Sequence, residues 1–324
     1  MYNILFLCDK KHFVSKMARI RFHSMKAIGE LSNLKYSGTG WEDYDNTLTV
    51  QENIDKIYLG KDKPDVVVAY EPLKMRNFAD IEATRCIRFA EMYDYKNTMQ
   101  EIQESKSNLI FCFHKNEMQR YQKVFKNHSE WPLKFVNISK CAEKTIFKDY
   151  QLPKICDILL VGSIWHVSKL GPHYPIRRRM HELLQKMPTK YKCGVFPHPG
   201  GEHLDAYTDR YAIEFARAIN SSKMCVTCSG LPKTRFAKYV EISLCNTAVV
   251  GDIPDDDPDH FKQYVIEVDM SMSDEEIVNK MVYYLEKNEE REKLVQAGRE
   301  MSLEYTQEKY AERFIKELDE YFKR

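Results

Sequence analysis

Short runs rich in apolar residues recur along the chain and alternate with segments of helical spacing. The runs cover residues 4–8, 63–69, 108–113, 134–138, 156–161, 223–227 and 247–250. A strand that is apolar at every position must be covered on both faces, as happens in a parallel sheet wrapped by helices. The alternation therefore predicts an α/β fold with open, doubly wound parallel sheets.

The length and the position of the runs predict two domains. A chain of 324 residues is long enough for two domains of ordinary size. The alternation stops near residue 150 and then begins again. Helices are expected over 15–31, 78–92, 175–187 and 210–219, with a short helix and connector over 142–153.

Charge and cysteine content exclude several classes of protein. The 49 Lys and Arg nearly balance the 48 Asp and Glu, so no general field favours nucleic acid, and none is expected as a partner. No apolar run approaches the roughly 20 residues that cross a bilayer. Most of the scattered cysteines lie in apolar runs, which indicates reduced, buried thiols and a cytoplasmic location.

The stretch from 235 to 252 carries the strongest functional pattern. It reads as a helix with Lys238 and Glu241, a tight turn, and a buried strand, preceded by a turn at Gly230 and by Lys233. Positive charge and backbone N–H groups at a helix start suit phosphate, and a carboxylate suits the hydroxyls of ribose. The alternative is that Lys238 and Glu241 form an ordinary exposed pair on one helix face.

A second cationic segment follows the strand that opens the second half. The turn Gly162-Ser163 is followed by a helix start that carries consecutive arginines, among them Arg177 and Arg178. The guanidinium fork matches phosphate oxygens, so either arginine is a candidate phosphate ligand, with Arg177 placed to lean inward. The alternative is a solvated basic helix face.

Two further patterns favour structural roles. The acidic run over 252–259 resembles a metal site, but oxygen ligands for a metal normally converge from several elements, so a surface loop or helix entry is expected and no metal is assigned. Cys225 and Cys228 lack a second pair at zinc spacing and are expected to be structural.

Three polar residues directly follow strands of the first half. They are Asp9, Glu71 and His114, and the carboxyl ends of parallel strands are where open α/β sheets bind ligands. Each is a candidate general base for a hydroxyl group. A single histidine is more often structural, and the sequence does not rank the three.

The order of these features resembles the glycosyltransferases of the GT-B type, and more narrowly the group 1 proteins related to the spore-maturation protein CgeB. The resembling segments are 157–163, 174–179, 217–222, 238–252 and 304–314. The likeness covers residues 135–324 well and the first half in outline. It implies two Rossmann-like domains facing a cleft, an acceptor domain over 1–148, a nucleotide-sugar domain over 149–304, and a helix over 305–324 that packs back on the first domain.

The resemblance also implies an activity. It is the metal-independent transfer of a hexosyl or pentosyl group from a nucleotide diphosphate-sugar, such as a UDP- or GDP-sugar, to a hydroxyl of a glycan or glycoconjugate. Glu241 would hold the ribose and His198 or its neighbours would border the base. The groups expected to stabilise the leaving diphosphate are Arg177 or Arg178, Lys233, Lys238, and N–H groups near Gly162, Ser163 and Gly230. His114, Glu71 or Asp9 would act as the base if the reaction inverts.

One position departs from the family pattern. Many retaining members carry a second glutamate on the amino-terminal side of the ribose glutamate, and Lys233 stands at that position here. The stereochemical outcome therefore stays open. Because a fold does not fix a function, a non-catalytic nucleotide- or sugar-binding module and a nucleotide-sugar epimerase remain alternatives.

Overall fold

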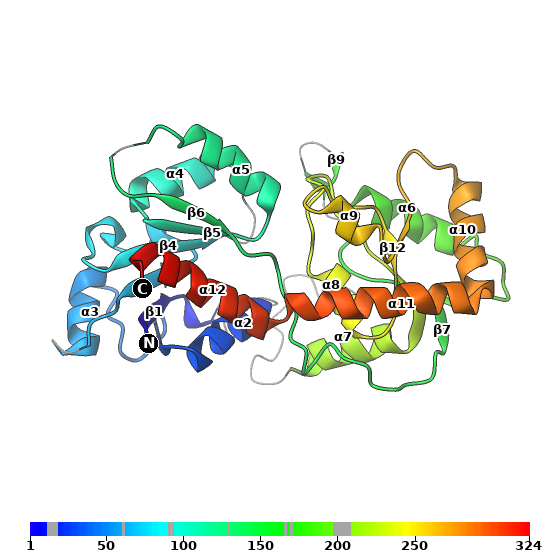
Figure 1. Ribbon diagram of the computed structural model, residues 1–324, viewed down its shortest axis with the longest axis horizontal. Helices are drawn as coiled ribbons and strands as arrows, with labels where there is room; N and C mark the ends of the chain where they lie inside the picture. Colours follow the sequence, from blue (N-terminus) through cyan, green and yellow to red (C-terminus); the bar gives the residue numbers. More distant parts are fainter. Residues whose placement is uncertain are drawn as a thin grey trace. The chain divides into compact units, whose positions relative to one another are not determined.

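The chain folds into two compact units (Figure 1). One contains Met1–Ser139 together with Gln307–Arg324, and the other contains Lys140–Thr306. The first crossing therefore lies at 139/140 and not at the expected 148, because Ala142, Ile146 and Phe147 pack into the core of the second unit. The computed structural model describes residues 1–11, 19–59, 62–89, 92, 94–128, 130–164, 167–168, 171–196 and 209–324.

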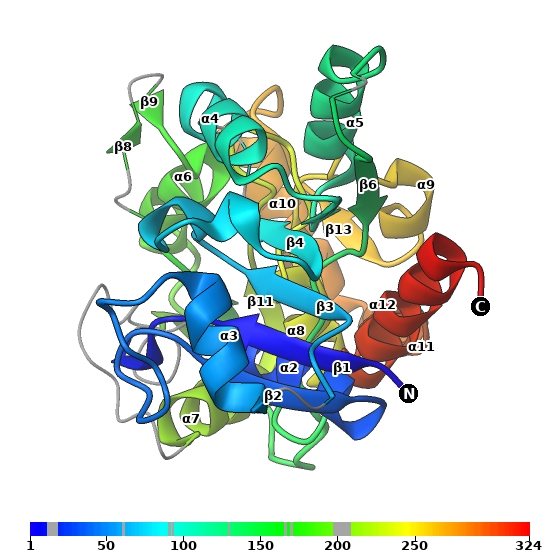
Figure 2. The same cartoon turned by 90° about the vertical axis from the view of Figure 1, so that its left-hand side faces the viewer.

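The first unit is built on a six-stranded parallel sheet with the order β2-β1-β3-β4-β5-β6, part of which faces the viewer in Figure 2. The strands are β1 (Asn3–Leu7), β2 (Asn33–Ser37), β3 (Val66–Ala69), β4 (Thr84–Phe89), β5 (Leu109–Cys112) and β6 (Lys134–Asn137). Its helices are α2 (Arg19–Glu30), α3 (Val50–Tyr58), α4 (Tyr95–Ser105), α5 (Lys115–Val124) and α12 (Gln307–Phe322), with 3₁₀ turns at Pro72–Lys74 and Phe78–Asp80.

Helices cover this sheet on both faces, which explains the unbroken apolar runs. In β5, Ile110 and Cys112 join a core cluster with Ile102 of α4. Phe111 points the other way and stacks on Phe314 of α12 with ring centroids 4.4 Å apart. The last helix thus belongs to the first unit, where it lies beside α2.

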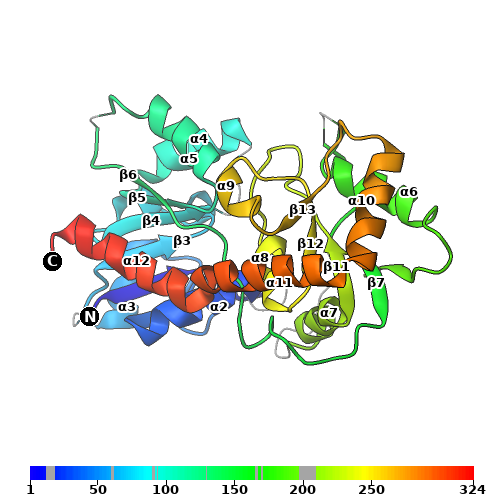
Figure 3. The same ribbon diagram turned by 45° about the vertical axis from the view of Figure 1, so that its right-hand side comes forward.

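The second unit has a five-stranded parallel sheet with the order β10-β7-β11-β12-β13 (Figure 3). The strands are β7 (Cys156–Leu160), β10 (Cys193–Val195), β11 (Ser222–Val226), β12 (Ala248–Gly251) and β13 (Val265–Glu267), and a hairpin joins β8 (Val167–Ser168) to β9 (Gly171–Pro172). The helices are α6 (Pro175–Leu184), α7 (Arg210–Asn220), α8 (Lys238–Leu244), α9 (Pro258–Phe261), α10 (Asp274–Glu286) and α11 (Asn288–Ser302), with a 3₁₀ turn at Leu303–Tyr305.

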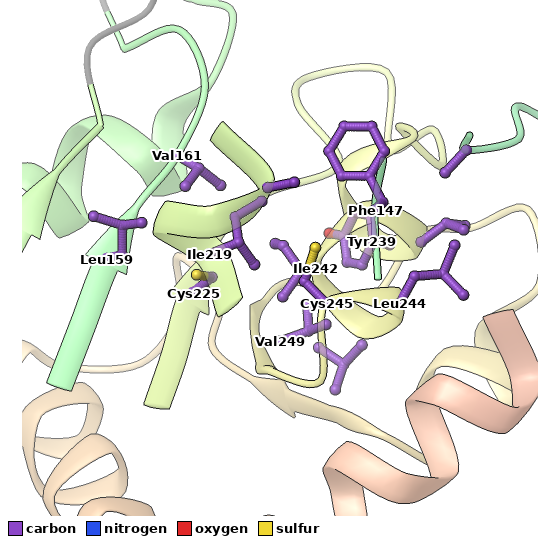
Figure 4. Packing of buried hydrophobic residues seen from close by; sticks show 14 of the residues in the cluster. Phe147, Leu159, Val161, Ile219, Cys225, Tyr239, Ile242, Leu244, Cys245 and Val249 are labelled. Carbon is purple, nitrogen blue, oxygen red and sulfur yellow. The ribbon is translucent and has the colours of Figure 1, made fainter. Parts of the chain in front are cut away.

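Helix α8 is held firmly against this sheet. Its Tyr239 and Ile242 pack with Leu159 of β7, Cys225 of β11 and Val249 of β12 (Figure 4). Burying large side chains of this kind contributes about 1.5–3 kcal/mol each. Helix α8, which carries Lys238 and Glu241, is therefore held in one position on the sheet by its buried side chains.

Two of the helix predictions are wrong. The segment expected to be helical over 78–92 contains β4, and residues 142–153 form turns without a helix. In β4 the apolar pattern is broken by Arg85 and Arg88. Arg88 is nevertheless buried, because its guanidinium donates to the hydroxyls of Tyr70 at 2.6 Å and Tyr310 at 2.8 Å. Strands β2, β8 and β9 and helix α3 were not predicted.

Other local predictions are confirmed. All the cysteines are free, and Cys225 and Cys228 are fully buried. In the described part of the chain, no helix combines the length and the apolarity that crossing a membrane requires.

Candidate functional site

The turn after β7 brings two cations to one backbone position. Gly162 adopts φ +94°, which a side chain rarely tolerates. A Cβ atom built on Gly162 would lie 2.7 Å from Nη1 of Arg177 and 3.0 Å from Cε of Lys238. Only glycine at this position lets Arg177 of α6 and Lys238 of α8 approach the same backbone.

Arg177 is buried at 3% exposure. Its Nη1 donates to the Ser163 carbonyl oxygen at 3.3 Å, and its Nη2 donates to Oγ1 of Thr227 at 3.2 Å. Its guanidinium also lies 4.2 Å from the ring centre of Tyr174. Among the described residues its Nε has no hydrogen-bond partner and no carboxylate forms an ion pair with it. A buried cation without a counter-charge is costly, so the arrangement suits an anionic ligand.

Helix α8 supplies the next charged pair. Nζ of Lys238 lies 3.5 Å from Oε2 of Glu241, and Nζ also lies 4.9 Å from the ring centre of Phe215. Glu241 is only 2% exposed, and its Oε2 has no hydrogen-bond partner among the described residues. The alternative of an exposed helix pair is therefore wrong. A buried carboxylate oxygen with unused acceptor capacity can receive ligand hydroxyl groups.

The loop from 229 to 237 is fixed by a buried carboxylate. Oδ1 of Asp252 accepts from the Ser229 N–H at 2.8 Å, Oδ2 accepts from the Ser229 hydroxyl, and the Tyr239 hydroxyl donates to the Asp252 carbonyl at 2.6 Å. Lys233 adopts φ +52° and its Nζ lies 2.9 Å from Oδ2 of Asp252. Burial lowers the pKa of Lys233, but the hydrogen bond and charge of Asp252 outweigh it, so the pKa is raised.

These charges do not cancel. Three cations, Arg177, Lys238 and Lys233, and two carboxylates, Glu241 and Asp252, therefore give these five side chains one net positive charge. Because Lys238 pairs with Glu241 and Lys233 with Asp252, the unmatched cation of the five is Arg177. The site is chemically suited to a polyanion that also carries hydroxyl groups.

The remaining predicted donor-site residues lie in different environments. Gly230 adopts φ +70° and packs against Phe236 and the His173 carbonyl, which accepts from the Leu231 N–H at 2.9 Å. Arg178 is exposed on α6. His198 lies outside the described residues.

The acidic run divides into an anchor and a short helix. Asp252 is the buried anchor described above, and Asp259 lies in α9. The expected surface loop is thus wrong for Asp252. In the part of the chain that the structure describes, no three His, Cys, Asp or Glu side chains are grouped to hold a metal ion.

Sequence reasoning did not identify the aromatic residues around the charges. Tyr211 of α7 was not singled out, yet burial and then the charge of Glu241 raise its pKa to about 12. Phe196, which follows β10, lies 5.7 Å from Tyr211 between ring centres. Tyr174 and Phe236 border Arg177. The feature of the sequence that could have identified Phe196 and Tyr174 is their position after a strand and before a helix.

The three candidate bases all lie beyond strand ends of the first unit. Asp9 follows β1 and Glu71 follows β3, and these strands are neighbours. Glu71 is exposed and its Oε1 lies 2.7 Å from Nζ of Lys74. His114 follows β5 and is buried at 1% exposure. Asp9 and Glu71 are therefore accessible to an acceptor in this structure, whereas His114 is enclosed within the unit.

Replacing Gly162 with alanine is expected to damage both the fold and the site. The new Cβ would require a strained φ and would displace Arg177, so we expect a loss of about 1–3 kcal/mol in unfolding free energy. Nucleotide affinity should fall at least about tenfold, which is about 1.4 kcal/mol. Urea denaturation and calorimetry measure the two effects. Gly194→Ala is the matched control, because a Cβ there makes only ordinary contacts, the nearest at 3.6 Å. Equal behaviour of the two variants would contradict the assignment.

Glu101 on α4 gives a pH-dependent prediction. Burial, and then the charge of Glu71, raise the pKa of Glu101 from 4.5 to about 7. The folded state favours the protonated acid, so this stabilisation is complete below pH 4.5 and is lost as the pH rises through about 7. Between pH 4.5 and 8, the unfolding free energy of wild type should therefore fall by about 1 kcal/mol relative to that of Glu101→Gln, after allowance for the partial exposure of Glu101. Denaturation midpoints across this range test it. Glu104→Gln, on the exposed face of the same helix, should follow wild type, and parallel curves for all three proteins would refute the prediction.

Comparison with known proteins agrees with this architecture. Residues 177–316 match a family model described as glycosyl transferase-like, a match that includes Arg177, Lys238 and Glu241. A search of the curated proteins found no match.

Three solved structures show the likeness of the whole chain. A glycosyltransferase from Rickettsia africae is 12% identical, with 99% of this chain and 98% of that chain covered at a TM-score of 0.64. HepE from Anabaena, solved with UDP and glucose, is 10% identical with 99% and 100% covered at 0.63. A UDP-N-acetylglucosamine 2-epimerase, so described, from Listeria monocytogenes is 15% identical with 99% and 97% covered at 0.56. The predicted GT-B fold is confirmed, and the relation to CgeB remains a prediction.

Proposed function

We propose that the chain is a glycosyltransferase whose second unit binds a nucleotide diphosphate-sugar. The observation that carries the proposal is the meeting of Arg177 and Lys238 at Gly162, beside the buried carboxylate of Glu241. A diphosphate would supply the counter-charge that Arg177 lacks, and a ribose would supply donors to Glu241. The family-model match and the fold, shared with a protein solved with UDP and glucose, support the same reading.

The residues of the second unit would act on the leaving group. The acceptor oxygen forms a bond to the anomeric carbon, the bond from that carbon to the phosphate oxygen breaks, and the diphosphate leaves with the electron pair. Arg177 and Lys238, with Lys233 and the N–H groups near Gly162, would stabilise the charge that develops on it. No metal ion enters this scheme, so the transfer should survive EDTA.

The proton of the acceptor hydroxyl needs a base if the reaction inverts. Asp9 and Glu71 are the exposed candidates at the strand ends, and His114 is the buried one. We propose a glycan or glycoconjugate hydroxyl as the acceptor, with either a hexosyl or a pentosyl group transferred. Asp9→Asn, Glu71→Gln and His114→Gln, each tested for transfer at saturating donor, will rank them.

The test of the function is turnover. Wild-type protein is incubated with UDP- and GDP-sugars, with EDTA and without acceptor, and the products are separated. Slow release of free sugar together with the nucleotide diphosphate supports a transferase. Binding without any product would instead establish a non-catalytic binding module.

A nucleotide-sugar epimerase is the second candidate, because a protein described as such shares the fold over the whole chain. It would convert the donor to a new sugar isomer in the same assay and need no acceptor. Analysis of the recovered sugar by NMR distinguishes this product from simple hydrolysis.

A further inference from the structure

Arg235 is a buried arginine of the second unit that the diphosphate scheme does not use. It is 3% exposed, and burial lowers the pKa of its guanidinium. Its Nη2 donates to the Lys140 carbonyl oxygen, and the guanidinium lies 3.7 Å from the ring centre of Tyr305. Among the described residues its Nε has no hydrogen-bond partner, and no side-chain carboxylate pairs with the guanidinium.

Both contacts of the Arg235 guanidinium fall on segments where the chain passes from one unit to the other. The chain crosses at 139/140 and again at 306/307. The Ala142 N–H donates to the Tyr305 carbonyl at 2.9 Å, and Ala142 forms a parallel bridge with Thr306. The two segments are thus joined to each other, and Arg235 binds one through its backbone and the other through an aromatic ring.

The neighbouring residue connects this junction to the proposed nucleotide site. The ring centre of Phe236 lies 5.1 Å from Nζ of Lys140 and 6.0 Å from the guanidinium carbon of Arg177. A Cβ on Gly230 would lie 3.2 Å from the same ring. Residues 235 and 236 therefore pack against the anion site on one side and against the crossing segments on the other.

We propose that Arg235 couples nucleotide binding to the two crossing segments, acting as a positioning residue and not as a ligand of the donor. The inference rests on the proposed function, since the coupled ligand is a nucleoside diphosphate. When a nucleoside diphosphate fills the site around Arg177, Phe236 and the 229–237 loop become more ordered. The contacts of Arg235 then make the segments that contain Lys140 and Tyr305 more ordered as well. A buried Nε that has no hydrogen-bond partner in the described part of the chain fits a contact that changes partners between two arrangements.

Hydrogen exchange tests the coupling in the full chain. Amide exchange at 140–142 and 303–306 is measured with and without saturating UDP, and separately GDP, while calorimetry measures nucleotide affinity. We expect nucleotide to slow exchange in these segments at least about fivefold in wild type. Arg235→Gln should abolish that slowing with less than about a threefold change in affinity.

Variants of the Tyr305 ring test the same coupling if Arg235→Gln fails to fold. Tyr305→Phe retains the stacking ring and should behave like wild type, whereas Tyr305→Leu should lose the slowing and still bind nucleotide. If Arg235→Gln and Tyr305→Leu keep the full response, the coupling is overturned while the nucleotide site stands. If neither UDP nor GDP binds wild type, the coupling and the proposed function are overturned together.

Discussion

Arg177→Ala is expected to lower kcat/KM for sugar transfer by at least about 100-fold, the loss typical of a single donor that stabilises developing charge. The reason is that Arg177 is the one cation of the described site with no acidic partner, so its charge is available to the diphosphate. Steady-state kinetics with the donor that turns over measures the effect. Arg177→Lys should recover only part of the loss, because an ammonium lacks the planar fork.

The adjacent arginine provides the control for this experiment. Arg178 is exposed on the same helix turn, so Arg178→Ala should leave kcat/KM within about threefold of wild type, as surface changes usually do. If Arg178→Ala loses the activity and Arg177→Ala keeps it, the phosphate ligand has been assigned to the wrong arginine.

Glu241→Gln is expected to weaken nucleotide binding at least about tenfold without destabilising the free protein. Glu241 is a buried carboxylate whose Oε2 accepts no hydrogen bond among the described residues, and its cationic neighbour Lys238 is 3.5 Å away. Removing the charge relieves desolvation, so the unfolding free energy should be unchanged or should rise by about 1 kcal/mol. Calorimetry measures the nucleotide affinity and chemical denaturation measures the unfolding free energy, both on one preparation.

Asp252→Asn is the matched comparison for Glu241→Gln. Asp252 is equally buried, but its oxygens accept from the N–H and hydroxyl of Ser229 and from Lys233. Asp252→Asn should lower the unfolding free energy by about 2–3 kcal/mol. The substitution breaks charge-assisted hydrogen bonds and places an amide N–H₂ group opposite the donors of Ser229 and Lys233. A stabilised Asp252→Asn, or a strongly destabilised Glu241→Gln, would reverse the roles assigned to these two acids.

The sequence predicts the sheets well because burial on both faces makes strands apolar throughout. The run 108–113, which contains β5, is such a case, with Phe111 and its neighbours packed against opposite layers. β4 was mistaken for a helix because Arg88 interrupts its apolar pattern. The hydroxyls of Tyr70 and Tyr310 that accommodate this arginine are distant in sequence, so no local pattern could reveal them.

The candidate site was only partly predictable for the same reason. The sequence placed Lys238 and Glu241 on one helix, but it could not distinguish an exposed pair from a buried one. It favoured Arg177 over Arg178 as the inward-leaning arginine without excluding Arg178, and only tertiary packing shows that Arg177 is the enclosed one. The partner of Lys233 was not predicted either, because Asp252, whose Oδ2 lies 2.9 Å from the Lys233 Nζ, is 19 residues further along the chain.

The most direct test of the donor site is a thermal-shift screen of UDP-, GDP-, ADP-, CMP- and dTDP-linked sugars, with EDTA present, on wild type and Glu241→Ala. A ligand at 100 times its Kd should add about 2.7 kcal/mol to the stability of the protein that binds it. The predicted result is that one nucleotide family stabilises wild type and that Glu241→Ala loses this response. If no nucleotide sugar shifts wild type, or if Glu241→Ala responds as wild type does, the site around Gly162, Arg177 and Glu241 is not a nucleotide-sugar site.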